Sequence, residues 1–260
     1  MLLNYQKINL HHGKMDINNK CIFLIHGLFG SLSNLAGLAN ALREQYHVIS
    51  VDLRNHGGSP HSADMSYQEM ANDLFELADH LHIKNFSIAG HSMGGKVAMT
   101  CALLQPQRIN KLLIADIAPI TYPDKHSEVF TALQALQQQP IKNRKAADLL
   151  LSRYLQSAEV RQFLLKSLRK QGDNYQLQFN LAAIQENYQA IRSGLATDGI
   201  FNKETLFIKG ANSDYIQPQD QAAILQLFPN AQVKVIANTG HWLHAEKPKI
   251  FNRLAWQFFS

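Results

Sequence analysis

The chain has 260 residues, of which 46% are hydrophobic and 17% charged, so it can bury a large core and shows no compositional sign of disorder. Its net charge of +5 is spread along the chain without an arginine-rich arm, which argues against a nucleic-acid-binding protein and favours anionic ligands over nucleic acid.

The first half of the chain alternates short apolar runs, typical of buried strands, with amphipathic helical patterns. Strands are predicted at residues 21–27, 46–54, 85–90 and 110–119, and helices at 34–45, 66–81 and 93–105. Ser66 and Glu69 form a capping-box pattern at the start of the second helix. Because no hairpin signals separate the strands, we expect a parallel sheet with helices on both faces.

The pattern changes between residues 121 and 200, where strand-like runs disappear. Helices are predicted at 127–139, 146–156, 158–171 and 177–192. Alternation then resumes with strands at 204–210 and 231–237 and helices at 217–228 and 247–259. We therefore expect an α/β core made of residues 1–120 and 201–260, with a helical lid or cap at 121–200. The alternative is a helical excursion that has no role at a site.

The stretch "GHSMGG" places Ser92 between a predicted strand and a predicted helix, in the pattern Gly90-X-Ser92-X-Gly94. A nucleophile elbow requires this context, because its serine stands on a strained turn and side chains at the flanking glycine positions would collide with the strand and helix. The helix N-terminus adds a positive dipole near a developing oxyanion. Ser92 is therefore the candidate nucleophile; the alternative is a structural glycine-rich turn.

A serine hydroxyl needs a general base, which in this architecture belongs on the loop after the last strand. His241 lies there in "NTGHWLH", directly after Gly240, and His244 is the competing candidate three residues later. His241 is preferred because it precedes the point where the helical pattern resumes.

Other histidines of the chain have simpler interpretations. His91 is expected to point away from Ser92, and His26 to support its own loop by hydrogen bonds. His56 and His61 are interpreted as turn residues.

Two carboxylates could orient the base. Asp116 follows the apolar run "LLIA", where an ionised carboxylate is costly unless it is paired, and a catalytic imidazole would be such a partner. Asp214 lies in the loop after residues 204–210 and could equally be an exposed loop residue. Asp116 is preferred, and Asp214 remains the alternative.

An oxyanion hole would complete the site. One donor is the backbone N–H of Met93, after the nucleophile, and the other should come from the loop after the first parallel strand. In "HGLFGS" the N–H of Leu28 is the first choice and that of Phe29 the second.

These motifs together resemble the α/β-hydrolase superfamily along the whole chain, and more narrowly the bacterial esterases of the YbfF type. The matching stretches are "HGLFGSLSNL", "VDLRNHGGSP", "GHSMGGKVAM", "QRINKLLIADIAP", "QFLLKSL" and "GHWLHAEKP". The resemblance implies an α/β-hydrolase fold with a mostly parallel central sheet, a helical cap, and serine esterase or thioesterase activity. It also favours Asp116, since relatives carry an aspartate in the "DIAP" motif; Asp214 is a departure that keeps the alternative open.

The resemblance suggests acyl esters, including acyl-CoA-type thioesters, as substrates. Basic residues of the predicted lid could meet phosphates or carboxylates, or could form a solvated helix face: Lys142, Arg144, Lys145, Arg161, Lys166, Arg169 and Lys170. Four apolar lid residues are expected to pack the lid onto the core or to line an acyl pocket: Phe163, Leu164, Leu165 and Leu168.

The sequence thus predicts hydrolysis of a small acyl ester or thioester through an acyl-enzyme on Ser92. A non-catalytic ligand-binding protein and a carbon–carbon bond hydrolase with the same triad are the alternatives. Neither a metal nor an organic cofactor is required, and no nucleic acid or stable membrane association is expected. Cys21 and Cys101 lie in apolar runs and are predicted to be buried free thiols. Without a signal peptide pattern or a membrane-length apolar run, the expected location is the cytoplasm. The pattern defines neither the physiological substrate nor the oligomeric state.

Overall fold

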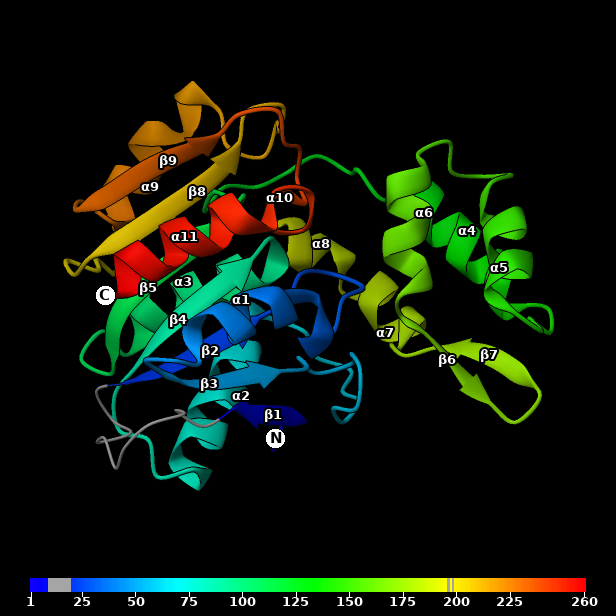
Figure 1. Cartoon of the computed structure of the whole chain (residues 1–260), viewed down its shortest axis with the longest axis horizontal. Coiled ribbons are helices and arrows are strands. Elements are labelled where there is room, and N and C mark those ends of the chain that lie inside the picture. The colour runs from blue at the N-terminus through cyan, green and yellow to red at the C-terminus, as the bar shows by residue number, and fades with distance from the viewer. Residues whose placement is uncertain (9–19, 196, 198) are drawn as a thin grey trace.

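The computed structural model describes residues 1–8, 20–195, 197 and 199–260. Figure 1 shows a central sheet covered by helices and, beside it, a second lobe formed by the middle of the chain. The predicted sheet with helices on both of its faces is confirmed.

The central sheet has seven strands in the order β1-β3-β2-β4-β5-β8-β9. They are β1 Tyr5–Ile8, β2 Cys21–Ile25, β3 His47–Val51, β4 Phe86–His91, β5 Ile109–Ala115, β8 Thr205–Gly210 and β9 Ala231–Ile236. All neighbouring pairs are parallel except β1 and β3, which pair antiparallel at one edge. The short β1 was not predicted. Because the remaining strands are parallel, their carboxyl ends and the loops that follow them meet along one edge of the sheet.

Helices cover the two faces of the sheet and divide the core into two clusters of buried side chains. The helices of the core are α1 Ala36–Leu42, α2 Tyr67–His80, α3 Met93–Leu104, α9 Gln221–Leu227, α10 Leu243–Glu246 and α11 Pro248–Phe259, with short 3-10 turns η1 Leu32–Leu35 and η2 Pro218–Asp220. Helices α1 and α11 pack on one face, and α2, α3 and α9 on the other (Figure 1). Burial on both faces explains why β2 is apolar throughout and why β4 is apolar or small as far as Gly90.

The second lobe is inserted between β5 and β8. It contains α4 Ser127–Gln137, α5 Arg144–Leu151, α6 Ala158–Leu165, β6 Leu168–Gln171, β7 Asn174–Leu177 and α7 Leu181–Glu186, and α8 Tyr188–Arg192 leads back to the core (Figure 1). We call residues 121–200 the cap; the structure describes all of them except 196 and 198.

The prediction that the cap is entirely helical was wrong. Strands β6 and β7 form an antiparallel hairpin with Gln171 opposite Asn174. Gly172 takes a φ of +59° in the two-residue turn between them, a conformation that glycine adopts without strain. The helix predicted at 158–171 therefore ends at Leu165, and the Gly-Asp dipeptide was the overlooked hairpin signal.

Cys21 and Cys101 are buried free thiols, as predicted. In the described part of the chain, no helix has both the length and the apolar character needed to cross a bilayer.

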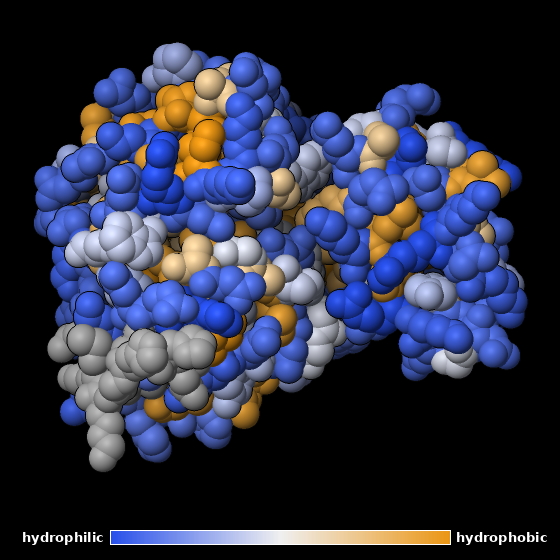
Figure 2. Space-filling model, in the orientation of Figure 1, coloured by the Kyte–Doolittle hydropathy of each residue, from blue (hydrophilic) through white to orange (hydrophobic). Residues whose placement is uncertain are grey.

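Figure 2 shows a mostly hydrophilic outer face on the cap. Several basic residues of the cap are engaged within the cap itself. Arg161 pairs with Asp148 (2.9 Å), and Arg144 donates to the backbone oxygen of Leu168.

Candidate active site

Ser92 is the single residue between β4 and α3, and its backbone is strained. Its φ of +53° and ψ of −123° lie in a region that non-glycine residues rarely adopt. A Cβ on Gly90 would lie 2.2 Å from the backbone oxygen of Gly94, and a Cβ on Gly94 would lie 2.4 Å from that of His26. Both flanking glycines are therefore required by space, as the sequence predicted for an elbow.

His241 follows β9 and forms a close contact with Asp116, which follows β5. The distance from His241 Nδ1 to Asp116 Oδ2 is 2.8 Å. The Asp116 side chain is fully buried, and it also accepts hydrogen bonds from the Gly210 amide (3.0 Å) and from the hydroxyl of Ser213. Three donors therefore compensate the burial of its charge.

Asp214, the alternative acid, points elsewhere. Its carboxylate pairs with Lys125 Nζ at 2.6 Å, and its side chain is 72% exposed. The hydrogen bond from Lys125 lowers the pKa of this carboxyl group. The geometry thus brings Asp116 rather than Asp214 to the His241 ring.

The His241 ring is held on one side by Tyr215. The two rings are stacked with centroids 3.9 Å apart. Ser92 and His241 line the same cavity of about 240 Å³, together with Phe163 and Trp242. With Nδ1 directed at Asp116, the remaining nitrogen of the His241 ring is the one available to a group in this cavity.

Two backbone amides near Ser92 are available as oxyanion donors. Within the part of the chain that the structure describes, neither the Leu28 amide nor the Met93 amide has a hydrogen-bond acceptor. The Phe29 amide, by contrast, donates to His56 Nε2 at 3.2 Å. The structure therefore favours Leu28 over Phe29 as the partner of Met93.

His26 and His56 connect two neighbouring loops by hydrogen bonds: each ring donates to the backbone of its own loop and accepts from a backbone amide of the other. His26 Nδ1 donates to the backbone oxygen of Gly27 (2.8 Å), and its Nε2 accepts from the Leu53 amide (3.1 Å). His56 Nδ1 donates to the backbone oxygen of Arg54 (3.0 Å), and its Nε2 accepts from the amide of Phe29. Burial lowers the pKa of both rings, that of His56 to about 3, so both are neutral at physiological pH. The predicted support of the loop by His26 is confirmed, whereas the interpretation of His56 as a simple turn residue missed its contact with the oxyanion loop.

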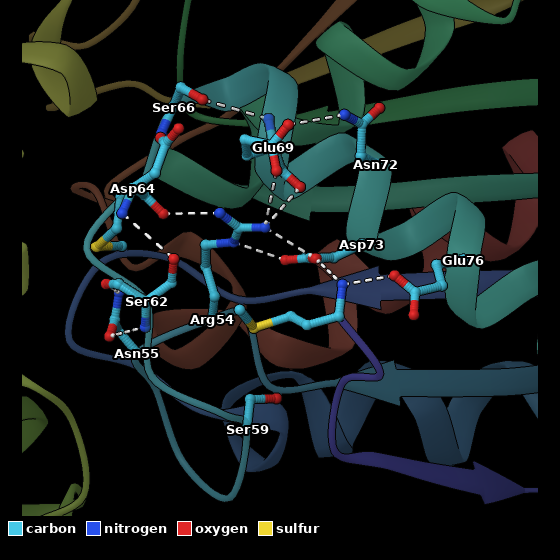
Figure 3. A network of polar contacts seen from close by, with 12 residues as sticks. Arg54, Asn55, Ser59, Ser62, Asp64, Ser66, Glu69, Asn72, Asp73 and Glu76 are labelled. Carbon is cyan, nitrogen blue, oxygen red and sulfur yellow. Dashed lines mark hydrogen bonds and ion pairs between the residues drawn. The ribbon is translucent and has the colours of Figure 1, made fainter.

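The loop that carries His56 is fixed by a buried ion pair (Figure 3). Arg54 donates to both carboxylate oxygens of Asp73 on α2, at 2.7 and 2.9 Å, and to the backbone oxygen of Asp64 at 2.7 Å. Ser66 caps α2 as predicted, but Glu69 turns its carboxylate toward Arg54 and Asn72 instead of completing a capping box. The network makes this loop a firm support for the site.

His91 and His244 lie behind His241. His91 Nε2 donates to the backbone oxygen of His241 at 2.9 Å, which ties the elbow to the histidine loop. The His244 ring lies 4.4 Å from that of His91. His244 is half-buried in α10, and its buried Nδ1 atom has no hydrogen-bond partner in the described structure. Among the described residues, no cluster of histidine, cysteine and carboxylate side chains could hold a metal ion.

Comparison with known proteins identifies the family. A family model described as the alpha/beta hydrolase fold matches residues 20–248. The chain is 40% identical to esterase YbfF of Escherichia coli over 232 residues, covering 89% of each protein. It is 39% identical over 253 residues to the sn-1-specific diacylglycerol lipase ABHD11 of Mus musculus, covering 94% of this chain and 82% of the mouse protein. A solved structure of a marine microorganism esterase matches with a TM-score of 0.92 and 37% identity over 99% of both chains. The chain therefore belongs to the α/β-hydrolase family, and the predictions of this fold, of a hydrolytic enzyme and of kinship with YbfF-type esterases are confirmed.

Proposed function

We propose that the chain is a serine hydrolase of carboxylic esters or thioesters, with Ser92, His241 and Asp116 as its catalytic triad. The observation that carries the proposal is the 2.8 Å contact between His241 Nδ1 and the buried Asp116 carboxylate. This contact fixes the proton on Nδ1 and leaves Nε2 free to act as a base, which is the role of the histidine in such triads.

The proposed reaction proceeds through an acyl-enzyme. His241 Nε2 takes the proton of Ser92 as its hydroxyl oxygen attacks the carbonyl carbon, and the amides of Leu28 and Met93 stabilise the oxyanion. His241 then gives this proton to the departing alcohol or thiol. A water molecule attacks the acyl-enzyme in the same way and releases the acid. No step needs a cofactor.

The cap is proposed to act as a lid over this site. Val129 of α4 and Val160, Phe163 and Leu164 of α6 line the cavity that contains Ser92. These apolar side chains would exclude water from the reacting ester and strengthen the electrostatic interactions within the site. We place the limits of the core at 1–120 and 201–260 and those of the lid at 121–200.

The nucleophile is tested by the hydrolysis of p-nitrophenyl acetate and butyrate. Ser92→Ala should lower kcat at least a thousandfold while circular dichroism stays unchanged, because catalysis without any nucleophile retains only the contribution of the oxyanion hole and binding. Equal rates for the variant and the wild type would instead favour a ligand-binding protein that keeps the fold.

The acid is tested by a matched pair of variants. Asp116→Asn should lower kcat by on the order of 10⁴-fold, since the amide favours the wrong imidazole tautomer. Asp214→Asn removes only an exposed pair with Lys125 and should change kcat less than about threefold. A larger loss in Asp214→Asn than in Asp116→Asn would reverse the assignment.

A further inference from the structure

Two cavities of unequal size meet at Ser92. We call the first the small recess. The side chains that line this cavity alone include Tyr67, Lys96, Ile117, Tyr122, Tyr188 and Ile191. We call the second the large pocket; it is lined by Val129, Val160, Phe163, Leu164, His241 and Trp242. Ser92 and Leu28 belong to both, so a carbonyl group bound at the proposed oxyanion hole would direct one substituent toward each cavity.

If the proposed function holds, the position of His241 determines which cavity binds the leaving group and which binds the acyl chain. The general acid must approach the leaving atom to within about 2.6–3.2 Å. Among the described residues, His241 lines the large pocket but not the small recess. The alcohol or thiol therefore leaves through the large pocket, and the acyl chain extends into the small recess.

The free volumes of the two cavities differ about sixfold. The small recess offers about 40 Å³ of free volume and the large pocket about 240 Å³, and both are partly open to solvent. A single water needs about 10–15 Å³ of such space, so the small recess holds on the order of three water-sized groups. This is enough for the carbon chain of an acetyl to butyryl group, but not for that of an octanoyl group.

The walls of the small recess are tied to the backbone, so they cannot easily retreat. The Tyr67 hydroxyl donates to the backbone oxygen of Ile191 (2.5 Å), and the Tyr122 hydroxyl donates to that of Tyr215 (2.5 Å). Lys96 Nζ, on a side chain that is almost completely buried, donates to three backbone carbonyls, among them that of Ile120 at 2.8 Å. Because the donors of Tyr67, Tyr122 and Lys96 already have partners, these three side chains have no donor left for a polar acyl substituent. The two other cations that line the small recess are also paired: Lys125 with Asp214, and Arg192 with Gln189 and the backbone oxygen of Tyr122.

We propose that this enzyme prefers esters with a short, unsubstituted acyl group, from acetyl to butyryl, and a larger apolar alcohol or thiol that packs against Phe163 and Trp242. This specificity rests on the proposed function, because it uses His241 as the acid that protonates the leaving group. Helices α4 and α6 of the cap, together with Trp242, then select the leaving group, while the core and the first and last residues of the cap limit the acyl chain.

The test uses two substrate series that vary one side of the ester at a time. The acyl series is p-nitrophenyl acetate, butyrate and octanoate. The alcohol series is methyl and hexyl acetate, whose hydrolysis is measured through the release of acetic acid. For the wild type, kcat/KM for butyrate should exceed that for octanoate at least tenfold, and kcat/KM for hexyl acetate should exceed that for methyl acetate at least tenfold, since a single methylene accepted or refused by an apolar site already changes kcat/KM by about tenfold.

Matched variants test which cavity binds which part of the ester. Ile191→Ala enlarges the small recess and should raise the ratio of kcat/KM for octanoate to that for acetate about tenfold. The ratio of kcat/KM for hexyl acetate to that for methyl acetate should stay within about twofold of the wild-type value. Phe163→Ala removes an apolar wall of the large pocket and should lower the hexyl-to-methyl ratio without changing the acyl-length dependence. If Ile191→Ala does not fold, Ile191→Val should give a smaller shift in the same direction.

Two outcomes would overturn the assignment of the cavities. One is wild-type turnover of octanoate as fast as acetate, and the other is a change in acyl-length dependence caused by Phe163→Ala instead of Ile191→Ala. A failure of the proposed function looks different: no ester of either series would be hydrolysed, or hydrolysis would persist in Ser92→Ala.

Discussion

Loss of the His56 ring should impair the oxyanion hole although this residue does not touch the substrate. His56 Nε2 accepts a hydrogen bond from the Phe29 amide, one residue away from the proposed donor Leu28. Phe29 also has a positive φ of 60°, so its backbone conformation depends on such contacts. The informative variants are His56→Leu, which removes both hydrogen bonds of the ring, and His56→Gln, whose side-chain oxygen can still accept from Phe29.

The size of the effect follows from what each variant leaves unpaired. In His56→Leu the Phe29 amide and the Arg54 carbonyl lose their partners in a fully buried site. Each unpaired buried group costs about 1–3 kcal/mol, so the loss of both partners should lower the free energy of unfolding by about 2–6 kcal/mol. Complete loss of one oxyanion donor lowers kcat by about 10²–10³-fold, and a displaced donor should cost between about tenfold and a hundredfold.

The assay separates positioning from general damage. Hydrolysis of p-nitrophenyl acetate is measured at a temperature where urea unfolding shows each variant to be folded. His56→Leu should lower kcat with KM within about twofold, because the oxyanion hole acts on the transition state. His56→Gln should recover most of kcat. Wild-type kcat in a folded His56→Leu enzyme, or an effect on KM alone, would refute this reasoning.

Three further predictions concern stability. Burial lowers the pKa of His56 and His244 to about 3 and that of His126 to about 4, so between these values and about 6.5 the unfolded chain binds more protons than the folded one. The free energy of unfolding should therefore fall by roughly 2 kcal/mol or more from pH 7 to pH 5, as measured by urea titration, and an unchanged value would contradict the neutral, buried state of these rings. Gly94→Ala places a Cβ at 2.4 and 2.5 Å from backbone oxygens at the end of β2 and should cost about 3 kcal/mol or more, seen as a lower Tm or as insoluble protein. Lys96→Met leaves the partly buried backbone carbonyls of Ile120 and Ser193, at the two connections to the cap, without this partner, so thermal denaturation should show a Tm at least several degrees lower, and an unchanged Tm would contradict a stabilising role for the Lys96 side chain.

Local patterns predicted the parts of the site that are set by short stretches of sequence. The spacing of Gly90, Ser92 and Gly94 between a strand and a helix is enough to predict the elbow, because steric limits at those positions act over five residues. The choice of His241 relied on the position of its loop after the last strand. Parallel strands bring their carboxyl ends to one edge, so loops distant in sequence could be expected to meet there.

Several side-chain contacts between distant loops, unlike the pairing of Asp116 with His241, were not predicted from the sequence. Asp214 is drawn away from His241 by Lys125, which lies 89 residues earlier in the chain. The stacking of Tyr215 on His241 and the contact of His56 with Phe29 likewise depend on the packing of separate loops. The missed hairpin of β6 and β7 is different, since its Gly172 turn was visible in the sequence and was outweighed by the apolar pattern before it.

Neutral imidazoles, rather than charged groups, hold the backbone around Ser92. His26, His56 and His91 each donate one ring N–H to a backbone carbonyl, and the first two also accept a backbone amide with the other nitrogen. A lysine or a carboxylate could supply only one of these two functions and would bring a charge into a buried site, at a cost of several kcal/mol without a partner. Burial lowers the pKa of all three rings, which keeps them neutral and fixed in one tautomer. As the pH falls toward the His56 pKa of about 3, protonation would remove the acceptor nitrogen that holds the Phe29 amide, so the oxyanion loop should lose this support before the Ser92 turn, which is set by steric contacts, is affected.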